Sequence, residues 1–120
     1  MDTPDSLPLV DVERLRQCAC GNPEQLRHIG GVFCETLTTG LFKLRLALDL
    51  ADLGDIRRAA HDIKNCLMLV SAQPAVAVAR QMEETATLEG DEGAIAAAST
   101  LEAWAGRVMG AVREATRGND

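Results

Sequence analysis

One histidine, His61, stands among basic residues at the spacing of a helical turn. Arg57 and Arg58 precede it by four and three residues, and Lys64 follows it by three. Residues three and four apart are neighbours on the surface of a helix, so this spacing surrounds the imidazole with positive charge. A phosphoryl group on a ring nitrogen brings close to two negative charges, which lysine and arginine hold through charge-assisted hydrogen bonds. These residue types therefore indicate a histidine suited to carry a phosphoryl group.

The helix that would carry His61 has an apolar stripe on its opposite side. Steps of three and four residues connect the members of this stripe, which are Ile56, Ala60, Ile63, Leu67 and Val70. Such a stripe is the buried face of an amphipathic helix. His61 lies far around the helix from it, in company with Arg57, Lys64, Asn65 and Met68. The pattern therefore predicts that this helix displays His61 and its companions to solvent.

The helices that must position His61 can be read from the rest of the chain. One short helix and four long ones are expected, over residues 9–19, 23–51, 55–71, 74–89 and 92–116. Asn22 is suited to cap the second helix, and Asp52 or Asp55 is suited to cap the helix of His61. Because the connecting turns are short, neighbouring helices must run antiparallel. We therefore predict an all-α fold, an antiparallel up-down four-helix bundle with a short additional N-terminal helix.

The domain limits follow from these helices. We expect one domain over residues 9–117, between a flexible leader at residues 1–8 and a frayed tail at residues 118–120. Three glycines, Gly30, Gly31 and Gly40, interrupt the long second helix, and each costs about 1 kcal/mol relative to alanine in a helix interior. We expect a kink or a close contact with another helix to explain them.

Composition narrows the classes of partner and location. The net charge of −6 argues against nucleic acid, because phosphate backbones are bound by basic surfaces. No apolar run is long enough to span a bilayer, and the N-terminal residues lack the basic and apolar regions of a signal peptide. We therefore expect a cytoplasmic protein that contacts neither nucleic acid nor membrane.

The cysteines and the second histidine give no sign of a metal site. The four cysteines are Cys18, Cys20, Cys34 and Cys66, and in a cytoplasmic protein we interpret them as reduced thiols. Their spacing, even with His28 added, matches none of the usual zinc patterns. We expect no bound metal and no cofactor, and we interpret His28 as structural or merely exposed.

The segment around His61 resembles the signature of the histidine phosphotransfer (HPt) domain family. In that family a Gly-Asp turn precedes a helix that carries A-H-x-[LI]-K-G, and the segment here reads L-x-L-A-D-L-G-D-I-R-R-A-A-H-D-I-K-N. The residues that match are Gly54, Asp55, Ala60, His61, Ile63 and Lys64. The resemblance covers roughly residues 32–115, because M-E-E-T-A-T-L-E-G-D resembles the family's next helix and its Gly-Asp break. Two positions depart from it, since Asn65 replaces the usual Gly and Met68 replaces a small residue.

The resemblance implies a function and a role for each residue near His61. His61 would take a phosphoryl group from the aspartyl phosphate of a receiver domain and pass it on, and Lys64 would steady the phosphoryl oxygens. Arg57, Arg58, Asn65 and Met68 would belong to the face on which the receiver docks. Mg²⁺ would come with the receiver. The expected partners are a response-regulator receiver domain, a hybrid sensor histidine kinase, or both, and the chain is expected to be a monomer.

The chain carries no ATP-binding loop of the G-x-x-x-x-G-K-[ST] type, so we expect a phosphocarrier rather than an enzyme that phosphorylates itself. Three other interpretations stay open. A binding-only module would dock a receiver or another signalling protein without transfer. A sensor-kinase dimerisation helix pair would also contain H-D-I-K-N, although Cys66 stands where that motif has Pro. A plain helical structural protein would leave the basic group around His61 unexplained. Neither the donor and acceptor nor the choice between a free-standing protein and a domain of a hybrid kinase follows from the sequence.

Overall fold

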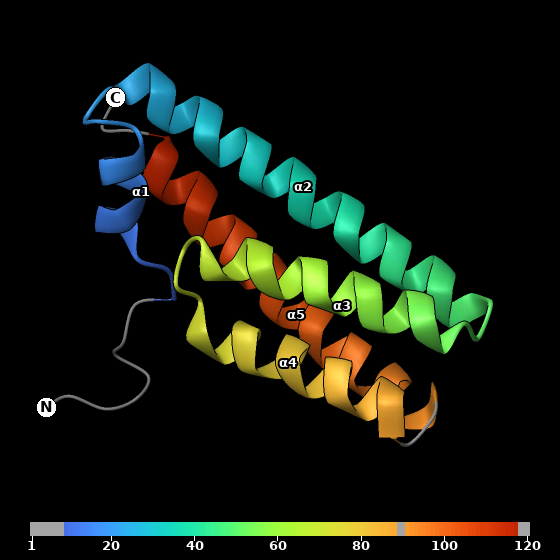
Figure 1. Cartoon of the computed structure of the whole chain (residues 1–120). Coiled ribbons are helices and arrows are strands. Elements are labelled where there is room, and N and C mark those ends of the chain that lie inside the picture. The colour runs from blue at the N-terminus through green and yellow to red at the C-terminus, as the bar shows by residue number, and fades with distance from the viewer. Residues whose placement is uncertain (1–8, 89–90, 118–120) are drawn as a thin grey trace, which may run out of the picture.

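The computed structural model describes residues 9–88 and 91–117, and in these ranges it contains helices and no strand (Figure 1). The helices are α1 (Val12–Cys18), α2 (Pro23–Asp49), α3 (Leu53–Met68), α4 (Gln73–Leu88) and α5 (Asp91–Thr116). The predicted all-α fold is confirmed. The predicted leader and tail, residues 1–8 and 118–120, lie outside the described residues.

The first three helices begin at side-chain caps. Asp11, Asn22 and Asp52 each accept a hydrogen bond of 3.0 Å from the backbone N–H three residues ahead. Such a bond satisfies one of the N–H groups that the first turn of a helix leaves without a partner. The Asn22 cap is confirmed. Asp52, rather than Asp55, caps α3, which therefore begins two residues earlier than residue 55.

Two long helices end before the predicted residues because the chain reverses through left-handed backbone. Ala51 and Ser71 have φ values of 52° and 54°. A left-handed residue just after a helix closes its last turn, and glycine usually fills this place. Neither position is glycine, so the usual residue that marks such a helix end is missing at both positions. As a result α2 ends at Asp49 and α3 ends at Met68.

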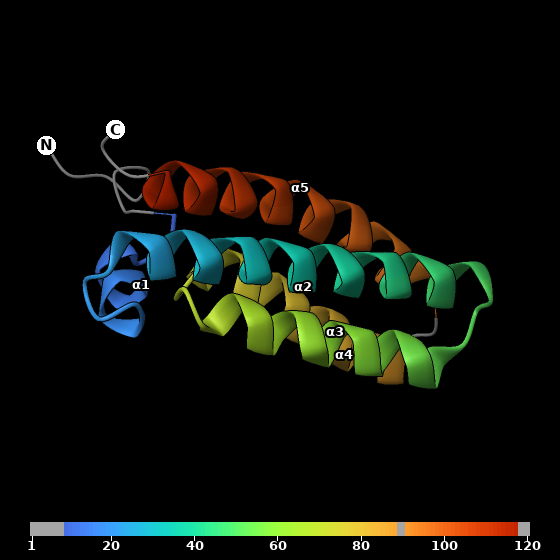
Figure 2. The same cartoon turned by 90° about the horizontal axis from the view of Figure 1, so that it is seen from above.

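The four long helices pack into one bundle. Contacts link α2 with α3, α3 with α4, α4 with α5, and α5 back to α2. Figures 1 and 2 show the α2–α3 turn at one end of the bundle and the α3–α4 turn at the other, with α1 lying across that second end. The core takes its large, fully buried side chains from all four, including Leu37, Leu44, Ile63, Leu67, Met82, Leu101 and Val108. Of the helices in the described ranges, none is long and apolar enough to cross a membrane.

Two glycines of α2 lie where another helix comes close. A Cβ atom added at Gly40 would lie 3.0 Å from Cγ1 of Ile63 on α3, and one added at Gly30 would lie 2.7 Å from the Thr116 side chain on α5. The predicted close helix contact is thus confirmed at both positions. At Gly31 such a Cβ would have no atom of the described residues within 4 Å, apart from the nearby backbone of α2 itself. Gly40 therefore lets α3 seat Ile63 against α2, two residues from His61.

Candidate functional site

His61 lies on the outer face of α3, as the helical pattern predicted. The five stripe residues are buried and belong to the core: Ile56, Ala60, Ile63, Leu67 and Val70. His61 is on the opposite side of the helix, with 49% of its side chain exposed. The ring is thus accessible to another molecule while one of its edges still contacts the protein.

That contact is with Glu83 of α4, which also binds Lys64. The Nδ1 atom of His61 lies 2.8 Å from Oε2 of Glu83, and the Nζ atom of Lys64 lies 2.9 Å from Oε1. One carboxylate therefore bridges the histidine and the lysine, each through a different oxygen. Glu83 is held between α3 and α4, with 22% of its side chain exposed.

The predicted exposure of Lys64 is wrong. Only 16% of its side chain is exposed, because the ammonium group turns toward α4 to reach Glu83. The helical pattern placed Lys64 on the outer face of α3 but carried no information about a carboxylate on the next helix. A long lysine stem can lie along the protein surface while its charged end reaches a partner.

The charge of Glu83 decides which nitrogen of His61 carries the proton. Burial alone would raise the pKa of Glu83, but the hydrogen bonds from Lys64 and His61 outweigh it and hold the pKa below its ordinary value. An ionised carboxylate only accepts hydrogen bonds, so Nδ1 of His61 is the donor and carries the proton. In the neutral ring the lone pair then belongs to Nε2. The site therefore presents a nucleophilic Nε2 on a ring anchored through Nδ1–H.

Arg57 and Arg58 lie near His61, but an ion pair neutralises one of these two cations. Arg58 forms an ion pair with Asp55, one turn earlier on α3. Arg57 is exposed, and within the described ranges it forms no ion pair. With Lys64 paired to Glu83, Arg57 is the remaining unneutralised cation of the predicted basic group.

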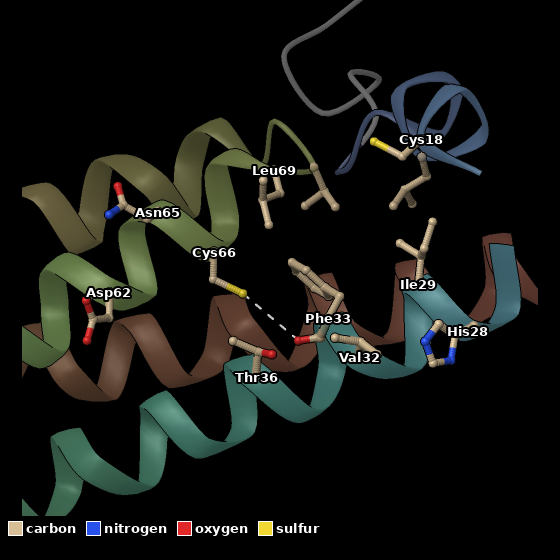
Figure 3. Close-up of a pocket in the computed structure, with 12 residues that line it drawn as sticks. Cys18, His28, Ile29, Val32, Phe33, Thr36, Asp62, Asn65, Cys66 and Leu69 are labelled. Carbon is tan, nitrogen blue, oxygen red and sulfur yellow. Dashed lines mark hydrogen bonds between the residues drawn. The ribbon is translucent and has the colours of Figure 1, made fainter. Parts of the chain in front are cut away.

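On the side of His61 that faces α2, the surface is apolar and hollowed. A groove of about 580 Å³ runs between α1, α2 and α3, and Figure 3 shows its labelled side chains. Asp62 and Asn65 of α3 lie along it with Leu69, and Val32 and Phe33 of α2 lie across from them. Asn65 is thus placed at the edge of this groove and away from Glu83. Met68 is also exposed, at 45%, and Leu69 at 60%, as predicted.

The cysteines do not form a reactive cluster. All four are free, with Cys34 and Cys66 buried in the bundle and Cys18 and Cys20 exposed near its end. Burial raises the pKa of Cys66 to about 11, and it also raises the pKa of Cys34. The Cys66 thiol points to the carbonyl oxygen of Phe33, 4.0 Å away (Figure 3). Thiols in this state are poor nucleophiles and poor metal ligands. Among the described residues, no group of three His, Cys, Asp or Glu side chains is placed to hold a metal ion.

The fold and the site together define a helical-bundle domain with an accessible histidine on its surface. The sequence matches the family model described as the Hpt domain over residues 29–115, which is most of the chain. The chain therefore belongs to the Hpt domain family. Comparisons with curated proteins and with solved structures gave no match. Membership of this family means phosphotransfer in two-component signalling, in which Hpt domains interact with receiver domains and histidine kinases.

Sequence reasoning missed Glu83. Met82 is buried in the core and Glu83 follows it directly, so no helical pattern singled out Glu83. The pairing with His61 depends on how far α4 is shifted along α3, and the turn at residues 69–72 sets that shift. The available signal was a single acidic residue beside a buried position, which is common on amphipathic helices.

Proposed function

We propose that this Hpt domain relays a phosphoryl group between the aspartates of receiver domains through Nε2 of His61. The observation that supports it best is the anchoring of Nδ1–H by Glu83, which leaves the lone pair on Nε2 of a half-exposed ring. The Nε2 lone pair would attack phosphorus, the P–O bond of the aspartyl phosphate would break, and its electron pair would return to the aspartate carboxylate. The reverse sequence would pass the phosphoryl group to a second receiver.

Lys64 is the proposed phosphoryl-stabilising residue of this chain. An ammonium group has three N–H donors. It can keep the bond to Glu83 and turn a second N–H toward an oxygen of a phosphoryl group on the same face of α3. Arg57, exposed and one turn from His61, is placed to add a weaker, solvent-screened attraction. This arrangement supports positioning and charge stabilisation, which are the main contributions that proteins make to phosphoryl transfer.

The proposed docking surface for the receiver lies on the α2 side of His61. The up-down order of the four long helices would place α2 beside α3 along its length. Exposed apolar side chains line the grooves there, namely Val32 and Leu46 of α2, Leu50 at the C-cap of α2 and Leu69 at the C-cap of α3. The other side of His61 is occupied by the ionic bridge from Glu83. A receiver that approached from α2 would cover apolar surface and leave this bridge in place, which suits a small transient interface. Arg57, Arg58, Asn65 and Met68 stay the predicted contact residues.

Several further points complete the proposal and stay predictions. The domain would act as a phosphocarrier rather than as an enzyme with its own ATP site. Any Mg²⁺ used in the transfer would be held by the receiver domain. The protein would work as a monomer in the cytoplasm.

The test is to incubate the purified chain with a panel of phosphorylated receiver domains. We expect label that is stable in base and labile in acid, because phosphohistidine has these properties and aspartyl phosphate does not. His61→Gln should abolish the label. His28→Gln is the matched control, since His28 and His61 are the two histidines of the chain, and it should retain acid-labile label. If receivers bind the chain and none labels it, the binding-only interpretation replaces the proposal.

A further inference from the structure

We propose that Glu83 holds a proton on Nδ1 of phosphorylated His61 and thereby sets the pH range in which the phosphoryl group can leave. This inference rests on the proposed function, because it concerns the state that follows phosphoryl uptake. It goes further by assigning a positioning role to a residue on α4 that neither touches the phosphoryl group nor belongs to the His61 motif.

The geometry fixes Glu83 in place at both oxygens. Oε2 accepts the bond from Nδ1 of His61 at 2.8 Å, and Oε1 accepts the bond from Nζ of Lys64 at 2.9 Å. Because Lys64 holds one oxygen, the other stays aimed at the ring. The carboxylate is partly buried, so water screens its charge less than it would at an exposed position.

The proton on Nδ1 matters when the N–P bond breaks. With Nδ1 protonated, the phosphorylated ring is a cation. As the aspartate oxygen of a receiver forms its bond to phosphorus, the N–P electron pair returns to Nε2 and the ring leaves as neutral imidazole. Without that proton the ring would have to leave as an imidazolate anion, which is a far poorer leaving group. Nδ1 keeps its proton throughout the transfer, so Glu83 need not exchange one.

The charges around the ring favour this role for Glu83. From α4 the group that faces His61 is Glu83 itself. On α3, Lys64 is paired with Glu83, Arg58 with Asp55, and Arg57 is exposed one turn away. From α2, Lys43 shares a groove with Arg58 and Asp62, on the side of α3 away from Glu83. Glu83 is therefore the anionic group in direct contact with Nδ1, and the ring cation is stabilised by it.

Replacing Glu83 with glutamine would weaken this stabilisation in two ways. The amide has no charge, and it offers one acceptor oxygen to two donors, Lys64 and Nδ1–H. Hydrogen bonds with an ionised partner are roughly twice as strong as neutral ones. We expect the midpoint pH for protonation of the phosphorylated ring to fall by about one unit, which corresponds to about a tenfold change in the protonation equilibrium.

The experiment uses the full chain, phosphorylated on histidine with phosphoramidate as a small chemical donor, so that receiver docking is not needed for loading. The ³¹P chemical shift is followed against pH for the wild type, Glu83→Gln and Glu84→Gln. Glu84 is the matched control, because it is the next residue of α4, is exposed, and loses the same charge. Circular dichroism checks that the variants stay helical. The rate of transfer to an unphosphorylated receiver is then measured over the same pH range.

We expect the Glu83→Gln midpoint and its transfer profile to move to lower pH, with Glu84→Gln superimposed on the wild type. Identical midpoints for all three proteins would overturn the inference, as would equal shifts in both variants, since these would reflect net charge alone. The proposed function fails in a different way, through a wild-type chain that carries phosphohistidine and never exchanges the phosphoryl group with a receiver.

Discussion

Two leucines at the end of α3, Leu67 and Leu69, test which face of this helix is buried and which is exposed. Leu67 is fully buried among the core residues, whereas 60% of Leu69 is exposed beside the α2 groove. Truncating a buried leucine to alanine costs about 2–5 kcal/mol, from lost transfer free energy and the cavity left behind. Exposed substitutions usually change stability by no more than about 0.5 kcal/mol.

For Leu67→Ala we expect a loss of about 3 kcal/mol in the free energy of unfolding, near the middle of that range. In a domain of this size, each kcal/mol lowers Tm by about 3–5 °C, so the expected fall is about 10–15 °C. Leu69→Ala should leave Tm nearly unchanged and instead weaken receiver binding. Thermal and urea unfolding measure the first effect, and titration with a receiver measures the second. Equal destabilisation by both substitutions would contradict the described orientation of α3, because the helix would then be rotated and His61 would not lie at the centre of its exposed face.

Three further predictions follow from the site. Because the folded-state pKa of Glu83 is lowered, the stability from its ion pairs is present at neutral pH and is lost as pH falls through that pKa. Glu83→Gln should therefore lower the free energy of unfolding by up to about 1 kcal/mol at neutral pH and match the wild type in acid. Urea unfolding at both pH values measures this difference. Gly40→Val should cost about 1–3 kcal/mol by overpacking against Ile63 at the α2–α3 contact, and an unchanged unfolding midpoint would contradict that contact. Lys64→Gln should slow phosphoryl uptake from a receiver at least tenfold while changing stability by less than about 1 kcal/mol, and uptake at the wild-type rate would remove Lys64 from the proposed mechanism.

The buried face of α3 could be predicted from the sequence because it depends on local periodicity. Residues three and four apart share a side of any helix, so the stripe that includes Ile63 and Leu67 fixed where His61 had to point. The caps were predictable for the same reason, since Asn22 and Asp52 act on N–H groups only three residues ahead. Gly40 indicated a close contact between helices, but the sequence did not show that the contacting residue would be Ile63.

The ionic bridge could not be predicted because it depends on how two helices are placed relative to each other. Glu83 meets His61 through the register of α4 against α3, which the turn at residues 69–72 determines. That turn uses left-handed backbone at Ser71, where sequence rules expect glycine. The predicted exposure of Lys64 was wrong for the same reason. The helical pattern placed Lys64 correctly on α3, but it contained no information about Glu83, its partner on α4.

The position of the phosphoryl group on the ring decides whether Nε2 of His61 is the phosphate-carrying atom. The chain is labelled with ¹⁵N in histidine, phosphorylated by a receiver domain, and its ring nitrogens are observed by NMR together with ³¹P. We expect a single N–P bond, at Nε2 of His61, with a proton still on Nδ1. A phosphoryl group on Nδ1 of His61, or on His28, would contradict this expectation, because Nδ1 is the atom that Glu83 holds and His28 lies on α2, at the groove rather than beside Glu83 and Lys64.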